Sequence, residues 1–413
     1  MRFEHRAVPI VLSAVLIDTI GFGIVLPVLP SLIMHLAHNT LADAARTGGA
    51  LLIAFSVAQF FAGPVIGSLG DHFGRRPVLL LAMLAFAIDY ALMAFAPTIG
   101  WLFLGRVIAG VAGAVYGPAN AVIADVTPPE KRGAAFGLMG AAFGVGFIIG
   151  PAIGGLLSVF GPRAPFLVAG GLALINAIWI GFVMPETLKP EDQRDFEWKR
   201  ANAFGAFIPL FNAGGALPLI VTAFFWQICQ MVYPSTWAFW CEARWGWSAR
   251  EVGWSLAATG VMMALTQTLL TGRLIARFGE ERTLVIGMVA ATAVFIAFNF
   301  ITAPWMVFPL LAVGTMMGVV FPSLNAVLSR MVDASNQGSL QGGMSSVGSA
   351  AAVIGPLMMT QVLASGTEHG VPGAAFLLSA AIALLSLGIV FVGVIRPLRA
   401  RATVAGGEPP PHL

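Results

Sequence analysis

The sequence predicts an all-α membrane protein with twelve transmembrane helices, arranged as two pseudo-symmetric six-helix bundles. Three observations support this fold class: the composition, a repeated motif, and the spacing of the apolar segments. Of the 413 residues, 58% are hydrophobic and only 10% are charged, whereas soluble domains carry about 25% charged residues. A chain of this composition cannot cover itself with polar surface in water, so we expect lipid to be its solvent.

A short motif recurs between the two halves of the chain. Gly67-Ser-Leu-Gly-Asp71-His-Phe-Gly74 lies between two apolar runs, and 205 positions later the chain reads Gly272-Arg-Leu-Ile-Ala-Arg-Phe-Gly279. The same offset matches Asn120-Ala-Val with Asn325-Ala-Val, and Gly150-Pro151 with Gly355-Pro356. A fixed offset of this kind indicates a duplicated half. Duplicated apolar halves are typical of secondary transporters, whose halves enclose a shared central site.

Twelve apolar runs are bounded by Gly, Pro or charged residues, and about 20 apolar residues suffice to cross a bilayer. We expect the first run to be a membrane helix and not a cleaved signal peptide, because it is long and contains Asp18. The expected spans are residues 8–34, 47–69, 77–96, 100–124, 133–159, 164–184, 216–240, 251–275, 283–303, 305–329, 337–364 and 371–395.

A charged stretch separates the first six runs from the last six. We expect an N-terminal six-helix bundle at residues 1–185, a cytoplasmic linker at 186–212, a C-terminal bundle at 213–397, and a disordered cytoplasmic tail at 398–413. Placing both termini and the even-numbered loops in the cytoplasm assigns most of the 22 Lys and Arg residues to that side. Because positively charged loops stay cytoplasmic, we expect a multi-pass protein of the bacterial inner membrane in this orientation.

Three charged residues lie inside apolar runs of the first half: Asp18, Asp89 and Arg106. A charge at the bilayer centre costs at least about 2.5–3.5 kcal/mol, so each charge requires a reason. Burial favours the neutral form of a carboxylic acid and a nearby arginine favours the charged form. A site that alternates between the two can couple proton movement to a conformational change. We hypothesise that Asp18 and Asp89 exchange protons and that Arg106 modulates them; the alternative is a static ion pair that fixes helix packing. The matching positions in the second half are uncharged: Ala223, Val294 and Leu311.

Several motifs resemble a known family. Gly67-x-x-x-Asp71-x-x-Gly74-Arg75-Arg76 resembles the signature of the major facilitator superfamily, and Gly150-Pro151-x-x-Gly154-Gly155 resembles the antiporter motif of its drug/proton exchangers. Longer runs resemble the tetracycline/proton antiporters: Asp18-Thr-Ile-Gly-Phe-Gly-Ile-Val-Leu-Pro27, Gly74-Arg-Arg-Pro-Val-Leu-Leu-Leu81, Ile123-Ala-Asp125 and Trp237-x-x-x-x-Glu242-x-Arg244. The resemblance covers nearly the whole chain. It implies the major facilitator fold and the proton-coupled efflux of tetracycline-like or other hydrophobic drug-like compounds by alternating access.

The sequence departs from the tetracycline antiporters at two places in its second half. Those proteins carry a histidine in helix 8 and an aspartate in helix 9, where this sequence has Met262-Met263 and Ala291-Thr292. Either protons are coupled through the first half alone, or the substrate differs from tetracycline.

The resemblance implies that the loop between helices 2 and 3 latches the two halves together on the cytoplasmic side. We expect Gly67 at a close approach of two helices and Gly74 in a tight turn. We expect Asp71 near the N-terminus of a neighbouring helix, where a carboxylate gains about 0.3–1 kcal/mol. The alternative is that the basic residues only anchor the topology. The predicted latch residues are Gly67, Asp71, Gly74, Arg75, Arg76, Asp125 and Arg132.

The fifth expected helix carries a stripe of glycines. Gly146, Gly150 and Gly154 are spaced by four, and membrane helices approach one another through such small residues. Pro151 removes a backbone donor and should kink the helix. The resemblance favours a hinge between the halves that seals against ion leak, and tight packing alone is the alternative. The predicted antiporter motif is Gly146, Gly150, Pro151 and Gly154.

Polar residues inside apolar helices usually face a cavity or the bundle interior, and aromatic residues cluster in the seventh expected helix. Such a wall suits a flat, amphipathic organic molecule. Each glutamine is equally consistent with a hydrogen bond that holds two helices together. The predicted substrate-binding residues are Gln59, Asn120, Gln227, Trp237, Gln267 and Asn325.

Other functions remain open from the residues alone. A proton-coupled solute importer or a lipid or lysolipid flippase would use the same fold. An enzyme is disfavoured, because the chain has no HExxH motif, nucleophile elbow or phosphate-binding loop. We therefore expect no catalytic residues, no metal site and no bound cofactor, with a proton gradient as energy source. We expect protons, lipid and a small amphipathic substrate, which can bind as a magnesium chelate, as partners, no nucleic acid, and a monomer.

Overall fold

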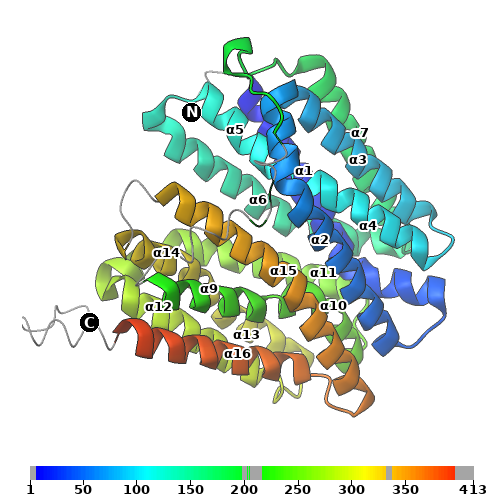
Figure 1. Cartoon of the computed structure of the whole chain (residues 1–413). Coiled ribbons are helices and arrows are strands. Elements are labelled where there is room, and N and C mark those ends of the chain that lie inside the picture. The colour runs from blue at the N-terminus through cyan, green and yellow to red at the C-terminus, as the bar shows by residue number, and fades with distance from the viewer. Residues whose placement is uncertain (1–5, 198–201, 203, 205–215, 332–336, 396–413) are drawn as a thin grey trace, which may run out of the picture. The chain divides into compact units, whose positions relative to one another are not determined.

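The computed structural model describes residues 6–197, 202, 204, 216–331 and 337–395, and the elements in these ranges are helices (Figure 1). The chain divides into two compact units. Unit 1 comprises Met1–Ala203 and Gly246–Gly260, and unit 2 comprises Phe204–Trp245 and Val261–Leu413. The expected tail at 398–413 lies outside the described residues, as does most of the expected linker beyond residue 197.

The first six expected spans are helices of unit 1. The fourth of them is two helices, because a turn at Ala114 and Val115 separates α4 from α5. The bounds are α1 Ala7–Ala37, α2 Leu41–Phe73, α3 Arg75–Phe95, α4 Ile99–Gly113, α5 Tyr116–Val126, α6 Pro129–Leu157 and α7 Ala164–Val183.

The second half of the chain is more interrupted than the first. A π-helix, η5 (Thr266–Thr271), follows α11, and a 3₁₀-helix, η7 (Thr315–Val319), separates α13 from α14. The α-helices are α9 Leu217–Gln230, α10 Val232–Trp245, α11 Ala249–Leu265, α12 Gly272–Ala297, α13 Val307–Gly314, α14 Val320–Met331, α15 Gln337–Glu368 and α16 Ala374–Val390.

Ten helical segments of the described chain are long and apolar enough to cross a membrane. The two other expected spans, 251–275 and 283–303, fall in α11, η5 and α12. There α11 has only 17 residues, and α12 contains a non-helical residue, Gly279, among charged side chains. Gly279 divides α12 into the end of one expected span and the beginning of the next.

Helix α2 begins six residues before the apolar run that predicts it. The Thr40 side chain accepts a hydrogen bond from the Asp43 backbone N–H at 3.2 Å, and its hydroxyl donates to the Asp43 carboxylate at 2.7 Å. This N-cap supplies a partner that the first helical turn lacks. The helix therefore extends into a polar first turn, which hydrophobicity alone does not reveal.

The duplicated halves share backbone features at matching positions. Gly74 and Gly279 both have positive φ angles (100° and 75°) with extended ψ angles, and side chains disfavour this conformation. The turn expected at Gly74 is thus confirmed. The carbonyls of Ala96 and Ile301, also 205 positions apart, each accept a hydrogen bond from an arginine, Arg163 at 3.0 Å and Arg244 at 3.1 Å.

The glycine stripe of α6 packs against α1 within unit 1. A Cβ atom at Gly146 would lie 2.7 Å from Thr19 Cβ, one at Gly150 2.6 Å from the Ile20 carbonyl oxygen, and one at Gly154 2.8 Å from the Ile24 carbonyl oxygen. Across this contact, Gly23 of α1 faces the ring of Pro151. The stripe therefore brings two backbones of the same bundle together, as the packing alternative requires.

We expect substitution of Gly150 by alanine to destabilise unit 1 by about 1–3 kcal/mol, because the added methyl group overpacks the α1–α6 contact. Gly140→Ala is a matched control on the same helix, since a Cβ there would meet no described atom within 4 Å. The thermal stability of both variants in detergent checks this expectation. Equal stability of the two variants would contradict the assigned packing.

Candidate functional site

The three charged residues expected inside the membrane lie together in unit 1. Arg106 of α4 forms a buried ion pair with Asp89 of α3, with side chains 6% and 0% exposed. A Cβ at Gly105 would lie 2.6 Å from the second carboxylate oxygen of Asp89, so this glycine makes room for the acid. In the described part of the chain, that oxygen and Arg106 Nε are buried without a hydrogen-bond partner. The pair is therefore incompletely satisfied, which is costly in a medium of low dielectric constant.

Asp18 of α1 lies beside the aromatic hydroxyl of Tyr116, the first residue of α5. The Tyr116 side chain interacts with the Asp18 carboxyl, and its hydroxyl lies 3.2 Å from Oγ1 of the adjacent Thr19. Arg106 is close enough to Asp18 to interact with it electrostatically. The structure thus brings Asp18, Asp89 and Arg106 into one electrostatic cluster.

Two tyrosines complete this cluster, and neither is among the site residues predicted from the sequence. Tyr90 is buried next to Asp89 on α3, and a Cβ at Gly21 of α1 would collide with its hydroxyl. Tyr116 is the partner of Asp18. The chain has only three tyrosines, and their rarity inside apolar runs was a signal that could have identified both.

Two of the predicted substrate-binding glutamines form hydrogen bonds that hold helical segments together. Gln59 Nε2 of α2 donates to the Gly113 carbonyl at 3.0 Å, and Gln267 Nε2 of η5 donates to the Gly318 carbonyl at 2.8 Å. Both acceptors lie where the α-helical geometry is interrupted.

The other substrate-binding candidates occupy different environments. Asn120 is exposed on α5, Gln227 of α9 approaches α15 at Gly348, and the buried Asn325 Oδ1 has no partner among the described residues. Trp237 is only 2% exposed. It packs with Tyr233, Trp240, Phe298 and Phe376, at centroid distances of 5.4–6.2 Å. Trp237 is therefore buried in an aromatic cluster of unit 2.

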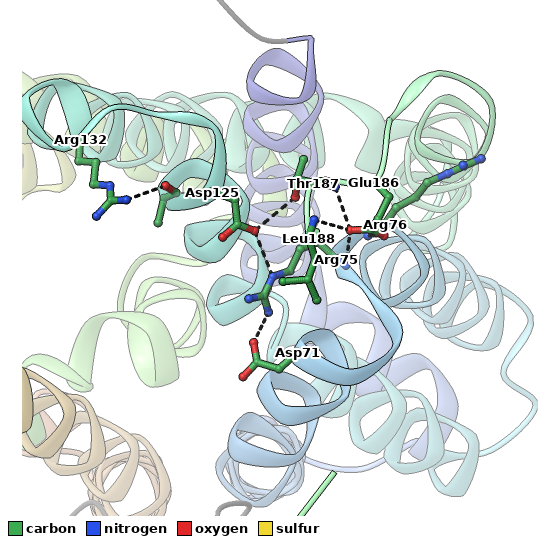
Figure 2. A network of polar contacts seen from close by, with 9 residues as sticks. Asp71, Arg75, Arg76, Asp125, Arg132, Glu186, Thr187 and Leu188 are labelled. Atoms are coloured by element: carbon green, nitrogen blue, oxygen red, sulfur yellow. Dashed lines mark hydrogen bonds and ion pairs between the residues drawn. The ribbon is translucent and has the colours of Figure 1, made fainter. Parts of the chain in front are cut away.

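The loop between α2 and α3 is the centre of a polar network (Figure 2). Arg75 is only 8% exposed. Its guanidinium lies 2.6 Å from the Asp71 carboxylate and 3.4 Å from that of Asp125 at the end of α5. Thr187, which follows α7, donates to the same Asp125 oxygen at 3.4 Å. The network therefore ties α2, α3, α5 and the segment after α7 together within unit 1.

The carboxylate at the N-terminus of α3 belongs to Glu186 and not to Asp71. Its oxygens accept hydrogen bonds from the backbone N–H groups of Arg75 at 2.8 Å and Arg76 at 3.1 Å (Figure 2). These N–H groups have no partner inside the helix, and an acid is favoured there by the helix dipole. Gly74 permits this approach, because a Cβ would collide with the Glu186 carboxylate. The sequence did not reveal Glu186, because 111 residues separate it from Arg75.

The remaining predicted latch residues have different surroundings. Arg132 donates to the carbonyls of Ala124 and Thr127 at the end of α5, and Arg76 donates to the Gly181 carbonyl near the end of α7. Both arginines cap helix ends that lack donors. Within unit 1, a Cβ at Gly67 would meet no described atom within 4 Å.

Comparison with known proteins places this architecture in a family. The profile of the Major Facilitator Superfamily matches the chain twice, at residues 11–243 and 203–411. The chain is 38% identical to the tetracycline resistance protein, class C, of Escherichia coli, over 93% of this chain and 96% of that protein. It is 35% identical to the class D protein of Salmonella ordonez, over 97% and 100% of the two chains. The human organic anion transporter MFSD10 (TETRAN) has a similar fold, with a TM-score of 0.69, 24% identity, and coverage of 93% and 99%.

We expect Asp89→Asn and Arg106→Gln each to destabilise the protein by about 3–5 kcal/mol, because each leaves its partner buried and unpaired. The double variant should be less destabilised than the sum of the two, since neither charge remains. Thermal unfolding of all three variants measures the coupling energy. Strictly additive effects would mean that the two side chains do not depend on one another.

Removing the charge of Glu186 should weaken the N-terminus of α3. We expect Glu186→Gln to cost about 0.5–1 kcal/mol, at the low end of capping effects because the side chain is exposed to solvent. Glu191→Gln is the control, because this acid forms a solvent-exposed ion pair with Lys189 at 3.7 Å, and such pairs contribute little. If the two variants melt at the same temperature, the charge of Glu186 does not stabilise the N-terminus of α3.

Proposed function

The chain belongs to the Major Facilitator Superfamily, and on that premise we propose that it exports tetracycline-like or other hydrophobic drug-like compounds in exchange for protons. As a member of this family it is a membrane transporter of small organic substrates and not an enzyme. Its apolar helices make it a multi-pass protein of the inner membrane. We further propose that both termini are cytoplasmic, on the basis of the positive-inside distribution of Lys and Arg.

The observation that carries the proposal is the cluster of Asp18, Asp89 and Arg106 in unit 1. Ionisable groups inside membrane segments are expensive and mark proton or substrate pathways. Asp89 has an arginine partner, whereas Asp18 has a neutral hydroxyl partner in Tyr116. Movement of Arg106 between the two acids would release a proton from one as the other takes one up. The same residues can therefore form a structural ion pair and exchange protons.

The second half supports coupling through the first half alone. Met263 lies against Gly318, and Ala291 and Thr292 are buried on α12, with the Thr292 hydroxyl bonded to the Met288 carbonyl at 2.7 Å. These residues replace the histidine and the aspartate of the tetracycline antiporters with groups that do not titrate. We propose that unit 2 contributes to substrate binding without exchanging protons.

The networks at the α2–α3 loop fit a conformational role. Arg75 is held by two carboxylates, and Glu186 fastens the segment after α7 to α3. We propose that this network keeps unit 1 rigid while the two halves move during alternating access, and that Asp71 and Asp125 can exchange partners during that movement. The proton gradient would be the energy source. The substrate would enter as a magnesium chelate if it is a tetracycline, and the monomer would be the working unit.

The proposal is tested in inverted membrane vesicles that hold a proton gradient and a fluorescent pH dye. Adding tetracycline with magnesium should release protons from the vesicles and dequench the dye. We expect Asp18→Asn to abolish this response, because the carboxyl that exchanges the proton is lost. Asp43→Asn is the matched control, since Asp43 is a half-exposed acid in the first turn of α2, where its carboxylate pairs with Arg46 at 3.1 Å and accepts from the Thr40 hydroxyl.

Three outcomes separate the alternatives. A response to other lipophilic drugs but not to tetracycline keeps the antiporter and changes the substrate. Substrate accumulation in the opposite direction supports an importer. No response to any compound, together with transfer of a fluorescent lysolipid between leaflets, supports a flippase and refutes proton-coupled drug efflux.

A further inference from the structure

The interruptions of the fourth and tenth membrane spans occur at matching positions. Gly113, the last residue of α4, and Gly318 in η7 are 205 positions apart, the offset of the duplicated motif. The end of an α-helix leaves carbonyls without intrahelical donors. In lipid no water is available to donate a hydrogen bond to these carbonyls, so the protein must supply the donor. Each interruption therefore needs a donor from a neighbouring helix.

In each half that donor is a glutamine. Gln59 bonds to the Gly113 carbonyl at 3.0 Å, and Gln267 bonds to the Gly318 carbonyl at 2.8 Å. A glycine leaves room for the amide in both cases, because an added Cβ would lie 2.8 Å from Gln59 Nε2 at Gly113 and 2.9 Å from Gln267 Nε2 at Gly318. Gln267 lies three residues beyond the position that matches Gln59, and it lies within the π-helix η5. The same contact is therefore built in both halves from different local geometries.

The segments after the two interruptions differ in chemistry. In unit 1 the chain turns at Ala114 and Val115 and then places Tyr116 beside Asp18 and Thr19. In unit 2 the residue matching Tyr116 is Phe321, and the residue matching Asp18 is Ala223. There η7 is also held by a hydrogen bond of 2.8 Å between the hydroxyls of Thr266 and Thr315. The interruption in unit 1 orients a hydroxyl toward an acid, and the one in unit 2 does not.

We infer that Gln59 is a positioning residue for the proton site: by holding the end of α4 at Gly113, it fixes the turn that presents the Tyr116 hydroxyl to Asp18. Gln267 holds the matching interruption in unit 2 without a proton site to orient. The inference rests on the proposed proton exchange at Asp18. It assigns the two glutamines, which share one hydrogen-bonding role, to different effects on transport.

The other ionisable groups around this site are Arg106 on α4 and Asp89 and Tyr90 on α3. Gln59 makes its bond to the α4 backbone beyond Arg106 and not to any of these side chains. Its removal changes no charge in the cluster. A change in the protonation of Asp18 upon its removal would therefore report a change in the position of Tyr116 or of the α4 end.

The test is an infrared titration of the purified protein in nanodiscs, in which the protonated carboxyl band of Asp18 is identified by its loss in Asp18→Asn. We expect Gln59→Met, which keeps the size but loses the donor, to shift the titration midpoint by about one unit, because the Tyr116 hydroxyl beside Asp18 and Thr19 is no longer held in place. Gln267→Met, the matched control, should leave the midpoint in place. Tyr116→Phe should reproduce the shift, and adding it to Gln59→Met should shift the midpoint no further.

Equal midpoints for Gln59→Met and Gln267→Met would overturn the inference, as would additive shifts from Gln59→Met and Tyr116→Phe. If Gln59→Met cannot be purified, the titration midpoint is measured in Gln59→Asn. This variant keeps the amide but is one methylene too short to reach the Gly113 carbonyl. An Asp18 band that does not titrate in the wild-type protein would instead refute the proposed proton exchange. Transport of tetracycline with magnesium should fall by a similar factor at every pH with Gln267→Met. With Gln59→Met, the pH dependence of transport should change.

Discussion

The structure depends on one constraint: lipid offers no hydrogen bonds, so backbone groups at a helix interruption inside the membrane must find a partner in the protein. The helix ends carry the same kind of unpaired backbone groups. Side chains supply these partners repeatedly. Glutamines do so inside the bundles, and arginines and a glutamate do so at the helix ends. The pairs are Gln59 with Gly113, Gln267 with Gly318, Arg163 with Ala96, Arg244 with Ile301, Arg132 with Ala124 and Glu186 with Arg75. Residues that resemble substrate ligands or topology signals in the sequence thus serve first to satisfy the backbone.

The duplication preserves this scaffold and not the chemistry. Positive φ angles at Gly74 and Gly279 and arginine partners at Ala96 and Ile301 recur 205 positions apart. The buried charges do not recur. Asp89 and Arg106 form an ion pair in unit 1, and the matching positions in the second half are Val294 and Leu311. Backbone requirements are the same in both halves, since both lie in lipid, whereas the proton exchange that we propose needs a buried acid in only one half. The halves could therefore diverge in side chains while keeping the same interruptions.

Close helix packing and charge burial support one another in unit 1. Glycines of α6 let α1 approach, and α1 carries Asp18 and Thr19 toward Tyr116. Gly105 and Gly21 make room for Asp89 and Tyr90 in the same way. Since the attraction within a buried ion pair offsets its desolvation only when the geometry is good, the small residues that make this room contribute to the cluster. A glycine stripe is therefore part of the electrostatic site and not only a packing device.

Composition, the 205-residue offset and the charges inside apolar runs were sufficient to predict the helical membrane fold, its duplication, and the grouping of Asp18, Asp89 and Arg106. These properties follow from periodicity and from the cost of burying charge, which are local to each segment. The tertiary structure alone decided that Glu186 caps α3, that Tyr116 accompanies Asp18, and that Trp237 belongs to the core of unit 2. Those contacts join residues far apart in the chain, and which face of a helix meets which neighbour is set by packing. The sequence determined which groups needed partners in lipid, and the folded arrangement of the helices determined which partners they received.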